Sequence, residues 1–169
     1  AFSMANSVML RQMIHSGKKY SGSERERDQG QYSKPKYEAP DYKKYAWRPF
    51  QLAYQLLVLE SLVNTSSDDR DVVDLLWFPT GGGKTEAYLG LAAFELIYRR
   101  LIHGDAGAGT SVIKRYTLRL LTTQQFQRAA TLICALELMR KDNTKLLGNE
   151  PYTLGLWVGE TSSPNKYTS

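Results

Sequence analysis

The sequence predicts an α/β fold in which helices flank a parallel β-sheet. Two observations lead to this prediction. Three short apolar runs alternate with two long helical patterns in the second part of the chain, and a glycine-rich turn separates the first run from the first of these helices. Such an alternation is typical of a parallel sheet covered by helices. We expect residues 46–169 to form this domain and residues 1–45 to form an N-terminal extension or linker.

The N-terminal extension is predicted to be a poorly structured basic arm. Residues 1–49 contain ten Lys and Arg against five Asp and Glu, whereas residues 50–169 contain twelve of each, so the arm carries the whole net charge of +5. Residues 16–45 show no apolar periodicity, although the apolar residues between Phe2 and Ile14 permit one short helix. The charge is compatible with contact to nucleic acid, but a solvated arm without that role is the simpler explanation.

The first elements of the predicted domain are a helix and a buried strand. Pro49 is well placed to open the helix, since proline is favoured at the first helical position, and apolar residues follow at helical spacing as far as Val63. A polar loop around residues 66–69 comes next. The apolar run from Val72 to Pro79 then has the length and composition of a strand inside a parallel sheet.

Two long helices and two further strands complete the predicted domain. The segment from Lys84 to Ile102 is apolar nearly all round, which predicts a helix buried on several sides. A second strand is expected over residues 111–116 and a third over residues 153–158. Between these strands, Thr122 and Gln125 have the spacing of a capping box, so we expect the second long helix to begin there.

The glycine-rich turn has the composition of a phosphate-binding loop. Gly83, Lys84 and Thr85 match the last three positions of the P-loop pattern, while Phe78 stands where that pattern has its first glycine. Glycines allow consecutive backbone N–H groups to converge on an anion, and the helix that follows adds the positive end of its dipole. The alternative is a flexible glycine turn that merely contains a lysine.

The residue types of this loop predict a site for a nucleotide and its Mg²⁺ ion. Lys84 would neutralise the β- and γ-phosphates and Thr85 would place its hydroxyl on Mg²⁺, so these two residues form the predicted catalytic pair. We therefore expect ATP and Mg²⁺ as cofactors. The predicted phosphate-binding segment comprises Thr80, Gly81, Gly82, Gly83, Lys84, Thr85 and Glu86.

The loop and the segment after the second predicted strand resemble the superfamily 2 helicases. The residues from Phe78 to Gly90 and from Arg115 to Ala129 carry this likeness, and they are most similar to the helicase proteins of bacterial DISARM anti-phage systems. The resemblance implies an incomplete N-terminal RecA-like ATP-binding lobe from an ATP-dependent DNA helicase or translocase. It also implies a protein that acts on nucleic acid together with other proteins of a defence complex. The single cysteine, Cys134, excludes an internal disulfide and fits a cytoplasmic protein.

The resemblance also implies adenine-binding residues upstream of the loop. In superfamily 2 helicases, a segment similar to Arg48-Pro49-Phe50-Gln51 binds the adenine. Gln51 occupies the place of the adenine-binding glutamine, whose amide can donate and accept at once, and Arg48 and Phe50 lie beside it. An ordinary polar position on an amphipathic helix explains Gln51 without any ligand.

The segment that leaves the second predicted strand is expected to contact nucleic acid, as the corresponding loop does in helicase cores. Its hydroxyl, guanidinium and amide groups can bind phosphates and sugars irrespective of base sequence. Helix capping explains the threonine and glutamine side chains as well. The expected contacts are Thr117, Arg119, Thr122 and Gln125.

Two other functions remain open. A P-loop enzyme of another class, such as a kinase, would explain Lys84 and Thr85, but such enzymes usually keep the glycine that Phe78 replaces. A truncated, non-enzymatic module that binds nucleic acid is the second alternative. No acidic strand of the Walker B type and no second lobe follow in the sequence, so we expect the chain alone to bind ATP weakly and not to hydrolyse it. Charged residues interrupt the longest apolar stretch, which argues against a membrane span.

Overall fold

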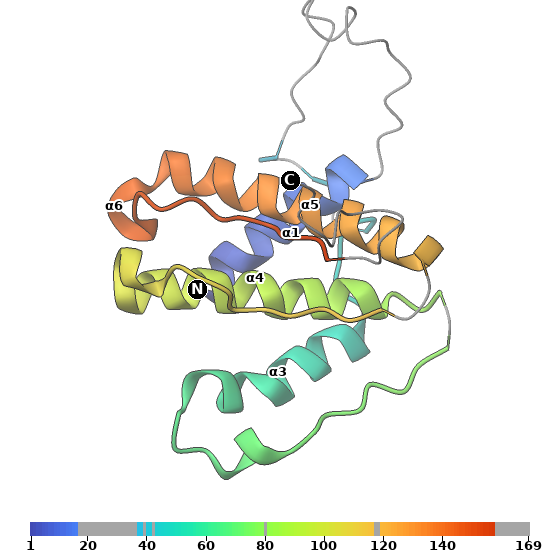
Figure 1. Ribbon diagram of the computed structural model, residues 1–169. Coiled ribbons are helices and arrows are strands. Elements are labelled where there is room, and N and C mark those ends of the chain that lie inside the picture. Colours follow the sequence, from blue (N-terminus) through green and yellow to red (C-terminus); the bar gives the residue numbers. More distant parts are fainter. Residues whose placement is uncertain (17–36, 39, 42, 80, 117–118, 158–169) are drawn as a thin grey trace, which may run out of the picture.

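The computed structural model describes residues 1–16, 37–38, 40–41, 43–79, 81–116 and 119–157. The long helices are α1 (Phe2–Ser16), α3 (Pro49–Val63), α4 (Lys84–His103) and α5 (Arg119–Asp142), and the short ones are η1 (Asp68–Asp71), η2 (Gly104–Gly107) and α6 (Thr144–Leu147). In Figure 1, α4 lies at the centre, with α3 on one side and α1 and α5 on the other. The described part of the chain is therefore organised around α4.

The hydrophobic core lies between α1, α4 and α5. Val8 and Met9 of α1, Ala93 and Ile97 of α4, and Leu136 of α5 are each at most 1% exposed. Apolar side chains that recur every three or four residues form the stripe that a helix buries against its neighbours. The prediction of a poorly structured N-terminal arm is therefore wrong for residues 2–16, because α1 supplies one face of the core. Most of the remaining arm, residues 17–36, lies outside the described residues.

The predicted RecA-like α/β fold with its parallel sheet is wrong, because the described residues contain no β-strand. The apolar runs over residues 72–79, 111–116 and 153–157 belong to no helix and do not pair with one another. Their large side chains point to solvent: Val73 is 92% exposed, Ile113 80% and Trp157 93%. A strand needs a neighbour whose backbone groups complete its hydrogen bonds, and an apolar run alone does not provide one.

Two of the three predicted helix starts are confirmed. Helix α3 begins at Pro49 and helix α4 begins at Lys84, as the proline and the glycine-rich turn predicted. The third is wrong, since α5 begins at Arg119 and Thr122 therefore lies inside its first turn. An N-cap residue must stand before the first helical residue, so Thr122 does not form the expected capping box.

Helix α3 buries polar side chains and exposes apolar ones. Gln51 and Gln55 are 4% and 3% exposed, whereas Leu56 and Leu57 are 55% and 69% exposed. The two glutamines lie four residues apart and so share one face of the helix. This face packs against α4, and it directs Gln51 toward the glycine-rich turn at the start of α4.

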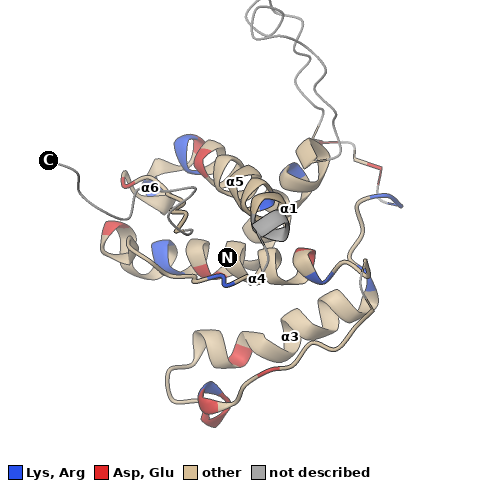
Figure 2. Cartoon of the chain, turned by 45° about the vertical axis from the view of Figure 1, so that its right-hand side comes forward, with Lys and Arg blue, Asp and Glu red and all other residues tan. Residues whose placement is uncertain are grey.

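Charges of both signs lie along α4 and α5, whereas α3 carries almost none (Figure 2). The short helix η1, which contacts α3, contains three aspartates and one arginine. Among the described residues, no helix combines the length and the apolar character that crossing a membrane requires.

Candidate phosphate-binding site

The glycine-rich turn forms the start of helix α4. Gly81 and Gly83 have φ values of 79° and 91°, which are left-handed conformations that other residues rarely adopt. The turn is closed by a 3.1 Å hydrogen bond from the Gly82 N–H to the Pro79 carbonyl. A Cβ atom on Gly83 would lie 2.7 Å from Gln51 Nε2, so the site requires glycine at this position for its conformation and for its space.

The first turn of α4 presents backbone N–H groups and one ammonium group beside this turn. The first amides of a helix have no carbonyl partner within it, and they carry the positive end of the helix dipole. Lys84 Nζ donates to the carbonyl oxygens of Phe78 and Pro79, the second at 3.2 Å. The ammonium is thus folded over its own loop and held by oxygen acceptors, the same type of partner that phosphate oxygens would provide.

The start of α3 holds the turn from the other side. Arg48 donates to the Gly82 carbonyl at 2.8 Å, and Gln51 Nε2 donates to the Gly83 carbonyl at 2.7 Å. The other end of the Gln51 amide accepts the Arg48 N–H at 2.8 Å. Two residues expected beside an adenine therefore bind the carbonyls of Gly82 and Gly83 and hold the turn against α3.

Phe78 is part of this site although the P-loop pattern has glycine there. Its ring stacks on Phe50, with 3.9 Å between the ring centroids and 14° between the planes, and its carbonyl accepts Lys84 Nζ. An aromatic pair of this geometry stabilises the contact between α3 and the turn. Sequence reasoning treated Phe78 only as a departure from the pattern, and the aromatic Phe50 upstream was the signal that pointed to a partner.

Helix α5 contacts the first turn of α4 through two residues. Gln125 Nε2 donates to Thr85 Oγ1 at 3.4 Å, and Arg128 forms an ion pair with Glu86. The hydroxyl of Tyr116 also donates to Gln125 Oε1 at 3.3 Å. These contacts bring Gln125, an expected nucleic-acid contact, to the predicted Mg²⁺ residue Thr85.

The remaining predicted residues are only partly placed. Thr80 and Thr117 lie outside the described residues. Arg119 and Thr122 belong to the first turn of α5, and their side chains are likewise outside the description. Their predicted contacts with nucleotide or nucleic acid therefore stay predictions.

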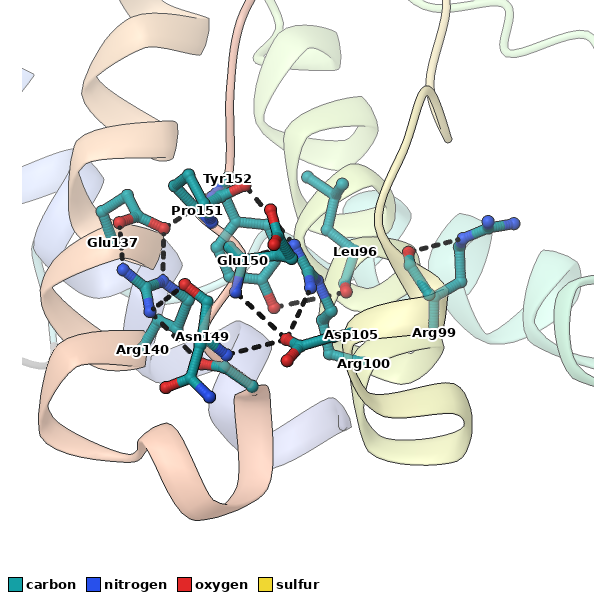
Figure 3. A network of polar contacts seen from close by, with 12 residues as sticks. Leu96, Arg99, Arg100, Asp105, Glu137, Arg140, Asn149, Glu150, Pro151 and Tyr152 are labelled. Atoms are coloured by element: carbon teal, nitrogen blue, oxygen red, sulfur yellow. Dashed lines mark hydrogen bonds and ion pairs between the residues drawn. The ribbon is translucent and has the colours of Figure 1, made fainter.

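A polar network at the other end of α4 was not predicted from the sequence (Figure 3). Arg100, 2% exposed, donates to the carbonyl of Glu150 at 2.8 Å and contacts Asp105 at 3.4 Å. Asp105 Oδ1 also accepts the N–H groups of Asn149 and Glu150, at 2.7 and 3.0 Å. The N–H of Glu150, followed by that of Asn149 and the charge of Arg100, lowers the pKa of Asp105 despite partial desolvation.

The second half of this network joins α5 to the same segment. Glu137 binds Arg140 at 2.8 Å and accepts the N–H of Tyr152 at 2.6 Å. The hydrogen bond from Arg140, more than that from Tyr152, lowers the pKa of Glu137. Burial raises the pKa of Tyr152 to about 12, and the Arg100 guanidinium lies 5.1 Å from its ring centroid. The network fastens residues 148–152 to α4 and α5.

A glycine-rich turn with a lysine and a threonine at a helix N-terminus is an arrangement that can bind a phosphate group. The chain is similar to the DISARM protein DrmA of Bacillus paralicheniformis (strain ATCC 9945a / NCIMB 11709 / CD-2), with 54% identity over 125 residues. That match covers 71% of this chain and 11% of DrmA, so the chain spans about a ninth of the curated relative. The chain is thus related to a DISARM protein, as the resemblance predicted. No family model and no solved structure matches it.

Proposed function

We propose that the chain is the ATP-binding part of a superfamily 2 DNA helicase or translocase that acts in bacterial anti-phage defence. The geometry of residues 81–85 carries the nucleotide-binding part of the proposal: a left-handed glycine turn at the start of α4, with the Lys84 ammonium folded over it. The similarity to the DISARM protein DrmA supports the role in defence, because the resemblance to DISARM helicases implies that role.

The residues of the turn and its surroundings have distinct roles in this proposal. The backbone N–H groups at the start of α4 bind phosphate oxygens, and Lys84 exchanges the carbonyls of Phe78 and Pro79 for the β- and γ-phosphates. Thr85 provides a hydroxyl for Mg²⁺. Bound ATP with Mg²⁺ would supply the phosphoryl group whose cleavage drives movement along DNA.

The residues upstream of the turn provide selectivity for adenine in this proposal. Gln51 lies beside the turn, and its amide already bonds at both ends, to the Gly83 carbonyl and the Arg48 N–H. An adenine edge would replace one of these backbone partners with groups of the same hydrogen-bonding type. Arg48 and Phe50 flank this position, and a base would exchange with their present partners, the Gly82 carbonyl and the Phe78 ring. The proposal also includes DNA and partner proteins of a defence complex as binding partners. The residues proposed to contact the DNA are Thr117, Arg119, Thr122 and Gln125.

The nucleotide site is tested by calorimetric titration of the chain with ATP and Mg²⁺. Because Lys84 would make charge-assisted bonds to the phosphates, Lys84→Ala should weaken binding about tenfold or more. Lys145→Ala is the matched control, since Lys145 is an exposed lysine on α6, at the opposite end of α4. Equal affinities for Lys84→Ala and Lys145→Ala, or no binding by the unmodified chain, would contradict the proposed site.

Selectivity for adenine is tested by the ratio of ATP affinity to GTP affinity. Gln51→Ala should lower this ratio toward one, because only ATP loses the amide partner. Gln124→Ala, at an exposed glutamine of α5, should leave the ratio unchanged. A ratio that does not change in Gln51→Ala favours another class of P-loop enzyme over the helicase. The ratio is informative even if Gln51→Ala weakens both nucleotides by loosening the turn.

A further inference from the structure

Helix α5 reaches the first turn of α4 with two side chains from one face. Gln125 and Arg128 are three residues apart, so they lie next to each other on the helix surface. They contact Thr85 and Glu86, which are consecutive residues of α4. Each residue of this pair on α4 therefore has its own partner on α5.

The ion pair between Arg128 and Glu86 is partly shielded from water. The side chains of Arg128 and Glu86 are 32% and 19% exposed, and burial lowers the pKa of Arg128. A carboxylate in the first turn of α4 would repel a phosphate bound at the same helix end. Arg128 neutralises that carboxylate through Oε1, while Oε2 stays beside the glycine turn, 3.5 Å from where a Cβ on Gly83 would stand.

The amide of Gln125 connects Thr85 to the segment before α5. It donates from Nε2 to the Thr85 hydroxyl and accepts on Oε1 from the Tyr116 hydroxyl. A carboxamide can do both at once, whereas a carboxylate or an alkyl chain of similar size cannot. The Thr85 hydroxyl thus has a hydrogen-bond partner 40 positions further along the chain.

We propose that Gln125 and Arg128 are positioning residues of the nucleotide site, which hold the Thr85 hydroxyl and the Glu86 carboxylate for an Mg²⁺-bound nucleotide. This inference rests on the proposed ATP site and extends it onto α5. A movement of the Thr85 hydroxyl would reach Tyr116 through the Gln125 amide, which is bonded to both residues. The nucleotide site and the segment expected to contact nucleic acid then share one amide group.

The inference predicts an effect that depends on Mg²⁺. Gln125→Leu should weaken ATP binding about three- to tenfold in the presence of Mg²⁺, the magnitude of one lost hydrogen bond. In EDTA the affinity for ATP should stay within about twofold of the unmodified chain, because the Thr85 hydroxyl acts through the metal. Gln124→Leu provides the matched control: Gln124 is the neighbouring glutamine, it is exposed, and its substitution should change neither affinity.

Arg128 provides the second measurement. Arg128→Met should weaken ATP binding both with Mg²⁺ and in EDTA, since it leaves the Glu86 carboxylate without its partner. Arg128→Lys should recover part of the loss, because it restores the positive charge. Gln125→Met, which keeps the length of the side chain, replaces Gln125→Leu if thermal melting shows that the latter does not fold.

The outcomes separate this inference from the proposed function. If the unmodified chain binds ATP and Lys84→Ala weakens binding, but Gln125→Leu behaves like Gln124→Leu, the positioning role is refuted and the ATP site stands. An equal loss with Mg²⁺ and in EDTA also refutes it for Gln125, because that pattern indicates only a structural contact. If the unmodified chain does not bind ATP, the proposed function fails, and this inference fails with it.

Discussion

The two ends of helix α4 differ in how their polar groups are satisfied. At the C-terminal end, Arg100 and Asp105 bind groups of residues 149–151 that come from a distant part of the chain. At the N-terminal end, Lys84 binds carbonyls of its own loop, five and six residues away. Both ends have tertiary contacts, but at the C-terminal end the charged groups themselves are held by them, whereas the Lys84 ammonium binds local carbonyls that a ligand can replace.

This difference separates a structural site from a site for binding. A buried arginine with several protein acceptors stabilises the fold, and removing it leaves those acceptors without partners. A lysine that rests on its own loop loses little when a phosphate replaces the carbonyls, because both partners are oxygen acceptors. We therefore expect substitutions at the C-terminal end to change stability and those at the N-terminal end to change affinity.

The largest effect is expected at the C-terminal end, for Arg100→Leu. Because the substitution removes a buried guanidinium that binds Asp105 and the carbonyls of Glu150 and Pro151, it should lower the free energy of unfolding by about 3 kcal/mol. Urea unfolding followed by circular dichroism measures this change. The affinity of the folded protein for ATP should stay within about twofold.

Arg99→Leu is the control for this substitution, since among the described residues Arg99 makes one hydrogen bond, to the Gly107 carbonyl at 3.3 Å. We expect a loss below about 1 kcal/mol from it. Similar losses for the two variants would show that the network around Arg100 does not close this end of the helix.

At the N-terminal end, Gly83→Ala should weaken ATP binding about tenfold while costing only about 1 kcal/mol of stability. Alanine at a φ of 91° is strained, and its Cβ would displace the Gln51 amide. Gly109→Ala is the control, because Gly109 has a φ of 107° and open space around it. Thermal melting should show a loss of stability in both variants, larger in Gly83→Ala because of the displaced Gln51 amide, and calorimetric titration should show a loss of affinity in Gly83→Ala alone.

Acid should weaken the C-terminal end selectively. The folded state lowers the pKa values of Asp105 and Glu137, so their contribution is present at neutral pH and is lost as pH falls through those lowered values. The stability should therefore decline below about pH 4. In Asp105→Asn, melting temperatures recorded between pH 2 and pH 7 should show a shallower decline. An unchanged profile would mean that Asp105 does not contribute to the acid sensitivity.

The smallest effect is expected for DNA binding. Arg119→Ala should weaken binding to single-stranded DNA about threefold, and it should reduce the slope of log affinity against log salt by about 0.7, the value for one phosphate contact. Fluorescence anisotropy at several salt concentrations measures both quantities. Lys145→Ala, at the C-terminal end of α4, should change neither. A reduced slope in Lys145→Ala instead would indicate that DNA binds at the C-terminal end of α4, and it would contradict the prediction.

The two ends also differ in how far the sequence predicted them. The glycine turn, Lys84 and the start of α4 are contiguous, so local residue types were sufficient to predict the turn and the helix start. The network around Arg100 joins residues up to 51 positions apart, and no spacing rule connects them. Phe78 lies between these cases. Its partner Phe50 is distant in sequence, but it belongs to the segment that was predicted to bind adenine.

The predicted sheet failed for a related reason. Residues 72–79 have the composition of a buried strand, but a strand depends on a second segment whose backbone pairs with it, and composition carries no information on that pairing. The sequence permitted a short helix between Phe2 and Ile14, which the structure has as α1, but the place of α1 in the core was not predicted. Its apolar residues Val8 and Met9 form a short stripe whose importance appears only when α4 and α5 cover it. Local chemistry was predictable here, and tertiary partners were not.

The central claim is that the N-terminal end of α4 binds a nucleotide phosphate and the C-terminal end does not. Two-dimensional ¹⁵N–¹H NMR of the chain, titrated with ATP and Mg²⁺, tests it directly, since glycine N–H groups mark both ends. The account predicts saturable shifts for the amides of Gly81, Gly82 and Gly83, with those of Gly104, Gly107 and Gly148 unchanged. Shifts confined to the second set of glycines, or none at saturating ATP, would contradict it.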